Sequence, residues 1–200
     1  MKSKAWITLA IVFFAASSFA GWLWHEKQYP SWQEEVQLSD GRVVTITQKR
    51  KYFDGYGTDQ SWVTFSLPET VGEQTWHSYL MPMRLDVFDG KVYVFGRPRG
   101  VKQFTHYGYP KHLVVAFLWN GSSFQRIPFN ELPKQVKEEE NILPCIDFQQ
   151  EKLISLTNKK TRWCPPTGDN KQLTKIINWD AYMKLADDYA RLDGGHALTD

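Results

Sequence analysis

The feature that most restricts the fold is an uncharged, mostly apolar run of twenty residues, AWITLAIVFFAASSFAGWLW, from Ala5 to Trp24. A helix of that length reaches about 30 Å, which matches the hydrocarbon core of a bilayer. Trp6 and Trp22 lie near its ends, where indole rings favour the headgroup region. A buried core helix is less consistent with the run, because no polar stripe interrupts it. The sequence therefore predicts an N-terminal hydrophobic helix at residues 1–24.

The charges around this run predict its orientation. Lys2 and Lys4 precede it, so the N-terminus is expected in the cytoplasm and the remaining chain outside, anchored in the inner membrane. A cleaved signal peptide is the alternative, since Ser18-Phe-Ala20 has the small-x-small pattern of a cleavage site. The product would then be secreted or periplasmic. Both interpretations place the protein in the cell envelope, with the membrane as a partner of residues 5–24 in the first.

The charge balance disfavours one class of partner. The chain has 24 basic and 22 acidic residues, and Lys2 and Lys4 supply the whole excess. Without residues 1–24 the chain is neutral, which gives no electrostatic reason to expect nucleic-acid binding.

Two cysteines, Cys145 and Cys164, are the only ones in the chain. In an oxidising compartment they are predicted to form one disulfide. Closing a loop of about twenty residues would stabilise the fold by roughly 3 kcal/mol in the chain-entropy model. Unpaired buried thiols are the alternative.

Residues 25–35 are polar and predict a linker, and residues 36–200 predict an extracytoplasmic β-rich domain. Val44 and Ile46 alternate with Val43, Thr45 and Thr47, as expected of a strand with one buried face. Turn pairs that favour hairpins lie between apolar runs at Asp40-Gly41, Asp89-Gly90 and Asn120-Gly121. ILPCIDF and KLISLT predict a further strand pair. The sequence thus predicts a mainly β fold, an antiparallel sheet or sandwich or a partial propeller-like stack.

The C-terminal region changes to helical spacing. Tyr182, Leu185, Tyr189 and Leu192 fall on one face of an amphipathic helix that Asn178 or Asp180 can cap and Gly194 can end. The last residues, GHALTD, are expected to fray.

Three stretches carry a resemblance to other proteins: WQEEVQLSDGRVV, LDVFDGKVYVFG and FLWNGSSFQRIPFNELP. Through them, residues 30–135 resemble a group of bacterial membrane-anchored or exported proteins to which no activity is assigned, so the resemblance implies no site residues. GKVYVFG with VVAFLWNGSSFQRIP is also similar to a kelch blade. The double glycine of such blades is missing, because Arg97 follows Gly96, and no fifty-residue repeat continues, so a complete propeller is not expected.

Motifs of common enzymes are lacking in the sequence. There is no G-x-S-x-G elbow, no H-E-x-x-H helix and no phosphate-binding glycine loop. No histidine pair has helical ligand spacing, so neither a metal nor a cofactor is predicted, and no residue is predicted to be catalytic. Asp54, Asp59 and Asp86 are candidate acids that fit turn or edge positions equally well.

The segment from Gly96 to His112 is the best candidate for binding, because it is basic, aromatic and free of acids. Arginine forks bind phosphate or carboxylate, and aromatic faces stack on sugars or cations. The alternative is an exposed loop whose rings pack back onto the sheet. The candidate residues are Arg97, Arg99, Lys102, Phe104, His106, Tyr107, Tyr109, Lys111 and His112.

The leading hypothesis is a non-enzymatic binding or accessory module tethered to the membrane. Its candidate partners are an envelope protein, a cell-wall polymer or an anionic lipid. An envelope hydrolase acting on a polysaccharide or lipid is the second hypothesis, and it predicts a pocket with converging carboxylates or a Ser–His pair. An inhibitor or immunity-type protein is the third, and a protruding 96–112 loop would favour it.

Overall fold

The computed structural model describes residues 29–54, 57–144, 153–159 and 177–199, with Ile11, Phe13, Ser17, Ser18 and Gly21 in the N-terminal segment. These five are helical. No helix within the described part of the chain is both long and apolar enough to cross a membrane. Most of the predicted span at residues 5–24 lies outside the described residues, as do Cys145 and Cys164 of the predicted disulfide.

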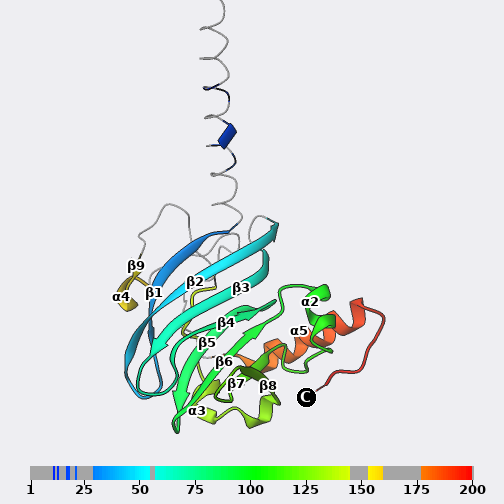
Figure 1. Cartoon of the computed structure of the whole chain (residues 1–200). Coiled ribbons are helices and arrows are strands. Elements are labelled where there is room, and N and C mark those ends of the chain that lie inside the picture. Colours follow the sequence, from blue (N-terminus) through cyan, green and yellow to red (C-terminus); the bar gives the residue numbers. More distant parts are fainter. Residues whose placement is uncertain are drawn as a thin grey trace, which may run out of the picture.

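The first sheet is a meander of four antiparallel strands, with a short fifth strand added in parallel (Figure 1). In spatial order they are β4 (Gly72–Ser78), β3 (Gly57–Leu67), β2 (Val43–Asp54), β1 (Ser31–Gln37) and β9 (Leu153–Ile154). Strand β1 begins at Ser31, inside the segment predicted as a linker. The predicted alternation is confirmed, because Ile46 is fully buried whereas Val43 and Thr45 are exposed.

The second sheet is antiparallel throughout its described strands. Its order is β5 (Met81–Phe88), β6 (Lys91–Arg97), β7 (Val115–Trp119) and β8 (Phe124–Ile127). Short helices follow its strands: α2 (Val101–His106) comes after β6, and η1 (Phe129–Glu131) and α3 (Lys134–Lys137) come after β8. Helix α4 (Leu156–Lys159) follows β9 of the first sheet. The longest described helix is α5 (Trp179–Leu192).

The three predicted hairpins are confirmed, but their turns differ. Asp89 and Gly90 both have positive φ, 50° and 71°, as a type I′ turn requires. At the β7–β8 turn only Gly121 has positive φ, and the loop is longer than a two-residue turn. The Asn120 side chain accepts hydrogen bonds there from the backbone N–H groups of Ser122 and Ser123, which replaces the I′ geometry.

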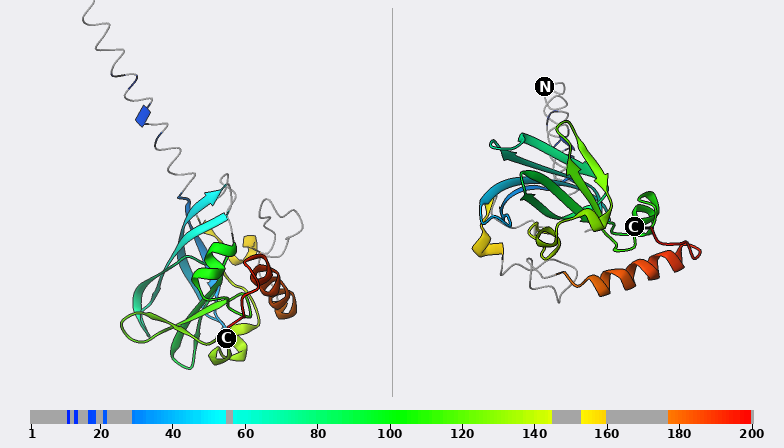
Figure 2. Two further views of the ribbon diagram at one scale, coloured as in Figure 1. Left: turned by 90° about the vertical axis from the view of Figure 1, so that its right-hand side faces the viewer. Right: turned by 90° about the horizontal axis from the view of Figure 1, so that it is seen from below.

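The two sheets share one hydrophobic core. Val36, Ile46 and Phe65 of the first sheet pack with Leu85 and Val94 of the second. The other face of the second sheet is covered by α3, α5 and the chain around them, so that sheet lies in the middle of three layers (Figure 2). This position explains why β5 is buried along nearly all its length. The arrangement is two packed sheets, not a propeller.

The C-terminal helix follows the prediction at its ends and departs from it on its buried face. The Asn178 side chain accepts a hydrogen bond from the N–H of Ala181, and Gly194 ends the helix at φ 94°. Ala186 and Ala190 are buried, whereas Leu192 is 75% exposed. The predicted apolar face is confirmed for Tyr182, Leu185 and Tyr189, which are partly buried in the core, and is wrong for Leu192.

Two further expectations concern β9 and the C-terminal tail. Strand β9 pairs in parallel with β1, a pairing that was not predicted, and most of ILPCIDF, its predicted partner, lies outside the described residues. The tail does not fray, because Thr199 accepts a hydrogen bond from the Lys111 N–H at 2.7 Å and donates its own N–H to Tyr109 O at 2.8 Å.

Candidate functional site

The segment from Gly96 to His112 is folded rather than looped out. Arg97 ends β6, Val101 to His106 form α2, and positive φ at Gly108 and Tyr109 turns the chain back. Gly96 is required by close packing, because a Cβ there would lie 2.6 Å from the carbonyl oxygen of Met81. A protruding loop, which would have favoured an inhibitor, is therefore not formed.

The predicted binding aromatics are largely used for packing. Phe104 is fully buried against Leu113 and α5. The Tyr107 hydroxyl accepts a hydrogen bond from the Tyr79 N–H, and burial raises the pKa of Tyr107. Tyr109 donates to Asp193 at 2.7 Å, and this hydrogen bond raises the pKa of Tyr109. The alternative considered from the sequence, rings that pack back onto the domain, holds for these three.

The remaining predicted residues do not form one group. His112 stacks on Phe129 with ring centroids 4.0 Å apart, beside the helix layer. Lys111 is exposed and pairs through its backbone with the C-terminal tail. Lys102 and His106 lie exposed on α2, on the side of Tyr79.

Arg99 is brought close to Arg50, an arginine outside the predicted segment, and Arg97 and Arg99 both lie near Tyr182. Arg97 lies over the ring of Tyr182, 5.4 Å from its centroid. Burial raises the pKa of Tyr182, while the positive charges of Arg97 and Arg99 oppose that rise. Arg50 of β2 is fully buried, and its pKa is lowered to about 10, mainly by burial and in part by repulsion from Arg99.

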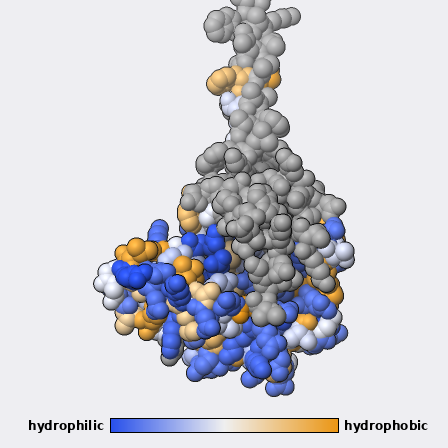
Figure 3. All heavy atoms as spheres, turned by 180° about the vertical axis from the view of Figure 1, so that it is seen from behind, coloured by the Kyte–Doolittle hydropathy of each residue, from blue (hydrophilic) through white to orange (hydrophobic). Residues whose placement is uncertain are grey.

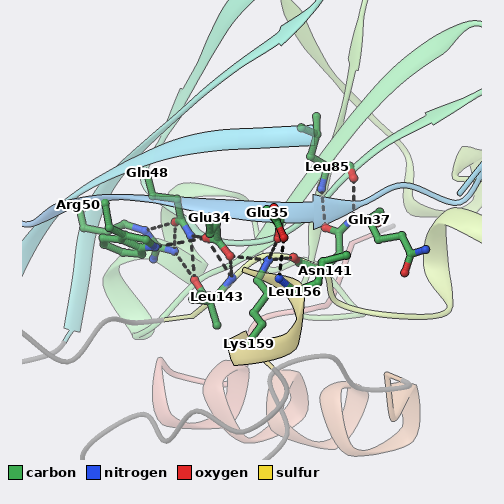
Figure 4. A network of polar contacts seen from close by, with 11 residues as sticks. Glu34, Glu35, Gln37, Gln48, Arg50, Leu85, Asn141, Leu143, Leu156 and Lys159 are labelled. Atoms are coloured by element: carbon green, nitrogen blue, oxygen red, sulfur yellow. Dashed lines mark hydrogen bonds and ion pairs between the residues drawn. The ribbon is translucent and has the colours of Figure 1, made fainter. Parts of the chain in front are cut away.

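Arg50 belongs to a buried polar network (Figure 4). Its guanidinium lies over the ring of Trp32 and donates to the Gln48 side chain, to Thr58 Oγ1 at 3.1 Å and to the Leu143 carbonyl at 3.0 Å. Gln48 in turn donates to the carboxylate of Glu34. Arg50 is thus held in place by the protein, and its donors are directed inward.

Lys159 completes the network from the other side of β1. Its Nζ contacts Glu34 Oε2 at 2.5 Å and donates to the carbonyls of Glu35 at 2.6 Å and Asn141 at 2.5 Å. Glu34 also accepts the Leu143 N–H at 3.0 Å. Buried charges are tolerated only when paired and hydrogen-bonded in this way. The network therefore fastens residues 141–143 and α4 to the first sheet.

A row of rings lies on the outer face of the first sheet and continues onto α2. Trp62 and His77 stack with centroids 4.8 Å apart, His77 lies beside Tyr79, and Tyr79 contacts His106 at 5.0 Å. The ammonium of Lys49 lies 5.7 Å from the Trp62 ring. Three of these rings lie outside the predicted segment: Trp62 in β3, His77 in β4 and Tyr79 in the turn between β4 and β5.

The two ends of the domain differ in charge. The N–H of Arg50 donates to the carbonyl of Pro30, so Arg50 marks the end where the chain enters the first sheet. We call this the entry end. Its described acids include Asp59, which pairs with Lys51, and Glu140, which accepts a hydrogen bond from Tyr182 beside Arg97, and its basic side chains outnumber these two. The basic residues are Lys49, Arg50, Lys51, Arg97, Arg99 and Lys102. The opposite end carries the β-turns and more acids than bases, namely Asp40, Glu69, Glu73 and Asp89 against Arg42 and Lys91. Seen from behind, the lower part of the described surface is largely hydrophilic (Figure 3).

The candidate acids are not gathered at one place. Asp59 pairs with Lys51 at 2.7 Å. Asp86 is fully buried, pairs with Arg84 at 2.6 Å and accepts from the N–H of Ser39, which are structural roles. Within the described ranges, no group of three or more His, Cys, Asp or Glu side chains could hold a metal ion.

Comparison of the chain with protein-family models, curated proteins and solved structures finds no match. The function is therefore argued from the geometry alone.

Proposed function

We propose that the protein is a non-enzymatic binding module of the cell envelope, tethered by residues 5–24. Its entry end would bind a phosphate or carboxylate group of the neighbouring membrane surface or of a cell-wall polymer. Arg97 and Arg99 would be the contact residues. Lys2 and Lys4, which precede the apolar run, favour a position of the domain outside the cytoplasm.

The observation that carries this proposal is that Arg99 lies close enough to the buried Arg50 to repel it, while Arg97 and Arg99 both lie near Tyr182. The carboxylate of Glu140, which accepts a hydrogen bond from the Tyr182 hydroxyl at 2.8 Å, offsets part of this positive charge, and an anion bound by the arginines would offset more of it. Nε of Arg97 is buried and has no hydrogen-bond partner among the described residues. A buried donor without an acceptor costs about 1–3 kcal/mol, so an oxyanion that reached Arg97 would supply what the protein does not.

Arg50 supports the site without touching the ligand. Its donors already bind Gln48, Thr58 and Leu143, so it contributes a fixed positive charge behind Arg97 and Arg99. A charge held in a poorly solvated interior acts over a longer range than an exposed one, because little water or salt screens it.

The position of the basic end favours a membrane surface as the source of the anion. Five residues lie between Trp24, the end of the predicted span, and Pro30, and the six residue steps from one to the other reach at most about 21 Å. The negative potential of an anionic leaflet attracts basic residues that lie within a Debye length of it. The entry end is therefore the part of the domain that the tether keeps nearest to the headgroups.

The test uses the full-length protein in nanodiscs of phosphatidylcholine alone or with phosphatidylglycerol. Hydrogen exchange of the α2 amides reports docking, which should slow exchange only with the anionic lipid. Replacing Arg97, Arg99 and Lys102 by Gln should remove about 1 kcal/mol per residue, roughly a hundredfold loss in the docked population. A variant with Arg42→Gln and Lys91→Gln at the opposite end is the matched control.

Equal exchange in both lipids, or an equal loss in the control variant, would contradict membrane docking. Polyphosphate added to protein in phosphatidylcholine nanodiscs separates the two sources of the anion. If the polymer alone slows exchange at α2, and the triple variant abolishes that effect, the site serves a cell-wall polymer. If neither lipid nor polymer changes the exchange, the anion site is wrong.

A further inference from the structure

A groove runs along the outer edge of β4, away from the arginines. It lies between β4, the edge strand of the first sheet, and the β7–β8 hairpin at the edge of the second sheet. Its volume is about 310 Å³. That volume lies at the small end of the range for ligand sites, about 300–1,000 Å³, and suits one or two sugar-sized rings.

The walls of the groove are aromatic. Trp76 of β4 meets Phe117 of β7 edge to face, with centroids 5.6 Å apart, and Trp119 meets Phe124 in the same way at 5.1 Å. Phe117, Trp119 and Phe124 are only partly buried, although they pack at the border of the main core. In an edge-to-face pair one ring face is left uncovered, and the C–H face of a sugar ring can stack on such a surface.

The rest of the lining is polar. Gln74, Thr75 and His77 stand on the strand side, and Ser122 and Ser123 stand on the hairpin side. Among the described residues that line the groove there is no Asp, Glu, Lys or Arg. Such a site offers hydroxyl and amide hydrogen bonds without selecting a phosphate, a carboxylate or an ammonium group.

Trp76 adds an independent sign of a missing polar partner. It is 1% exposed, and its indole Nε1–H has no acceptor in the described part of the structure. A buried indole N–H normally has a hydrogen-bond acceptor, since burying this donor without one costs free energy. A ligand oxygen that entered beside Phe117 could accept this hydrogen bond.

We propose that this groove is a second binding site, for a neutral saccharide of one or two rings. Trp119 and Phe124 stack on its C–H faces, the hydroxyl and amide side chains bind its hydroxyl groups, and Trp76 donates its N–H to a ring or hydroxyl oxygen. The site is independent of the anion site at the entry end, because it shares none of Arg50, Arg97 and Arg99.

A peptide strand added to the free edge of β4 is the competing occupant. The groove favours the saccharide, because its volume is that of a small ring ligand and its walls present ring faces. Strand addition instead needs several consecutive backbone hydrogen bonds along Gly72–Ser78. The two occupants also differ in their effect on β4 amide exchange, which allows the experiment to separate them.

The experiment titrates full-length protein in nanodiscs, since glycoside detergents carry sugar headgroups. The neutral probes are cellobiose, maltose and N,N′-diacetylchitobiose, and galacturonic acid serves as a charged comparison. Calorimetry should give a Kd on the order of 1 mM or tighter for at least one neutral probe and no binding of the acid. The ¹⁵N indole signal of Trp76, assigned with Trp76→Phe, should move during that titration.

Trp119→Ala should weaken binding at least tenfold, and Trp179→Ala, which removes a likewise partly buried tryptophan on α5 outside the groove, should leave the Kd unchanged. Ser122→Val, at an exposed turn, gives a second variant that leaves the core intact and should weaken binding more than twofold. The proposal is overturned if no neutral probe binds at roughly 10 mM, if binding survives Trp119→Ala, or if the Trp76 signal stays still. Without sugar, the amide exchange of β4 could also slow as the protein concentration rises. That result would assign the β4 edge to strand pairing between copies of the protein and would also overturn the saccharide proposal.

Discussion

Replacing Lys159 by Met tests whether the buried network holds the C-terminal half of the domain in place. Nζ of Lys159 is fully buried and serves the Glu34 carboxylate and the carbonyls of Glu35 and Asn141, all within 2.6 Å. Methionine keeps most of the side-chain volume, so the loss is electrostatic rather than steric. Removing one partner of a buried ion pair costs about 3–5 kcal/mol, because the other charge remains buried.

That cost is a large part of the 5–15 kcal/mol by which domains are usually stable. With a urea m value of about 2 kcal/mol/M, the unfolding midpoint of Lys159→Met should fall by roughly 1.5–2.5 M. Circular dichroism of the full-length protein in nanodiscs measures the midpoint. Lys184→Met, on the exposed side of α5, is the control and should change stability by less than about 0.5 kcal/mol.

The double variant Glu34→Gln/Lys159→Met sharpens the test. With both charges removed no buried charge of the pair is left alone, so the double change should cost at least about 1 kcal/mol less than the two single changes added together. The reasoning is refuted if Lys159→Met costs less than about 1 kcal/mol, or if the two changes are additive. Either result would mean that the ion pair does not fasten α4 to β1.

Two further predictions concern packing and pH. Gly96→Ala should destabilise the domain by about 1–3 kcal/mol in urea unfolding, because the added Cβ would lie 2.6 Å from the carbonyl oxygen of Met81. The control is Gly100→Ala, which should be near neutral because Gly100 has extended backbone and open space around it. Asp193 accepts from Tyr109, and this bond lowers the pKa of Asp193. The hydrogen bond therefore stabilises the folded state at pH values above the ordinary carboxyl pKa. This stabilisation is lost as pH falls through the lowered pKa of Asp193. In Asp193→Asn this acid-dependent loss, followed by the Tyr109 ring signals in NMR, should disappear, and an unchanged pH profile would contradict the assignment.

Local signals in the sequence predict the elements whose stability is local. The turn at Asp89-Gly90, the cap at Asn178 and the alternation around Ile46 each depend on a few neighbouring residues, and all three are found in the structure. Strand β9 has two residues, and its partner lies about 120 positions earlier in the chain, at Gln33 and Glu34. Nothing in KLISLT itself specifies a parallel pairing, so the sequence did not predict this one.

The buried arginine shows why the candidate site was only half predictable. Extending the alternation from Val44 and Ile46 along β2 places Gln48 and Arg50 on the same inward face, and the structure confirms that both are buried. A hydrophobicity pattern alone assigns an arginine to the surface, since charges are rarely buried without partners. The partner that makes burial tolerable is the carbonyl of Leu143, 93 residues away in the chain. A charged residue at an inward position of a strand thus predicts a buried polar contact, because it requires a polar partner from another part of the fold. At Arg50 that requirement brings the 141–143 segment to the end of the domain where Arg97 and Arg99 also lie.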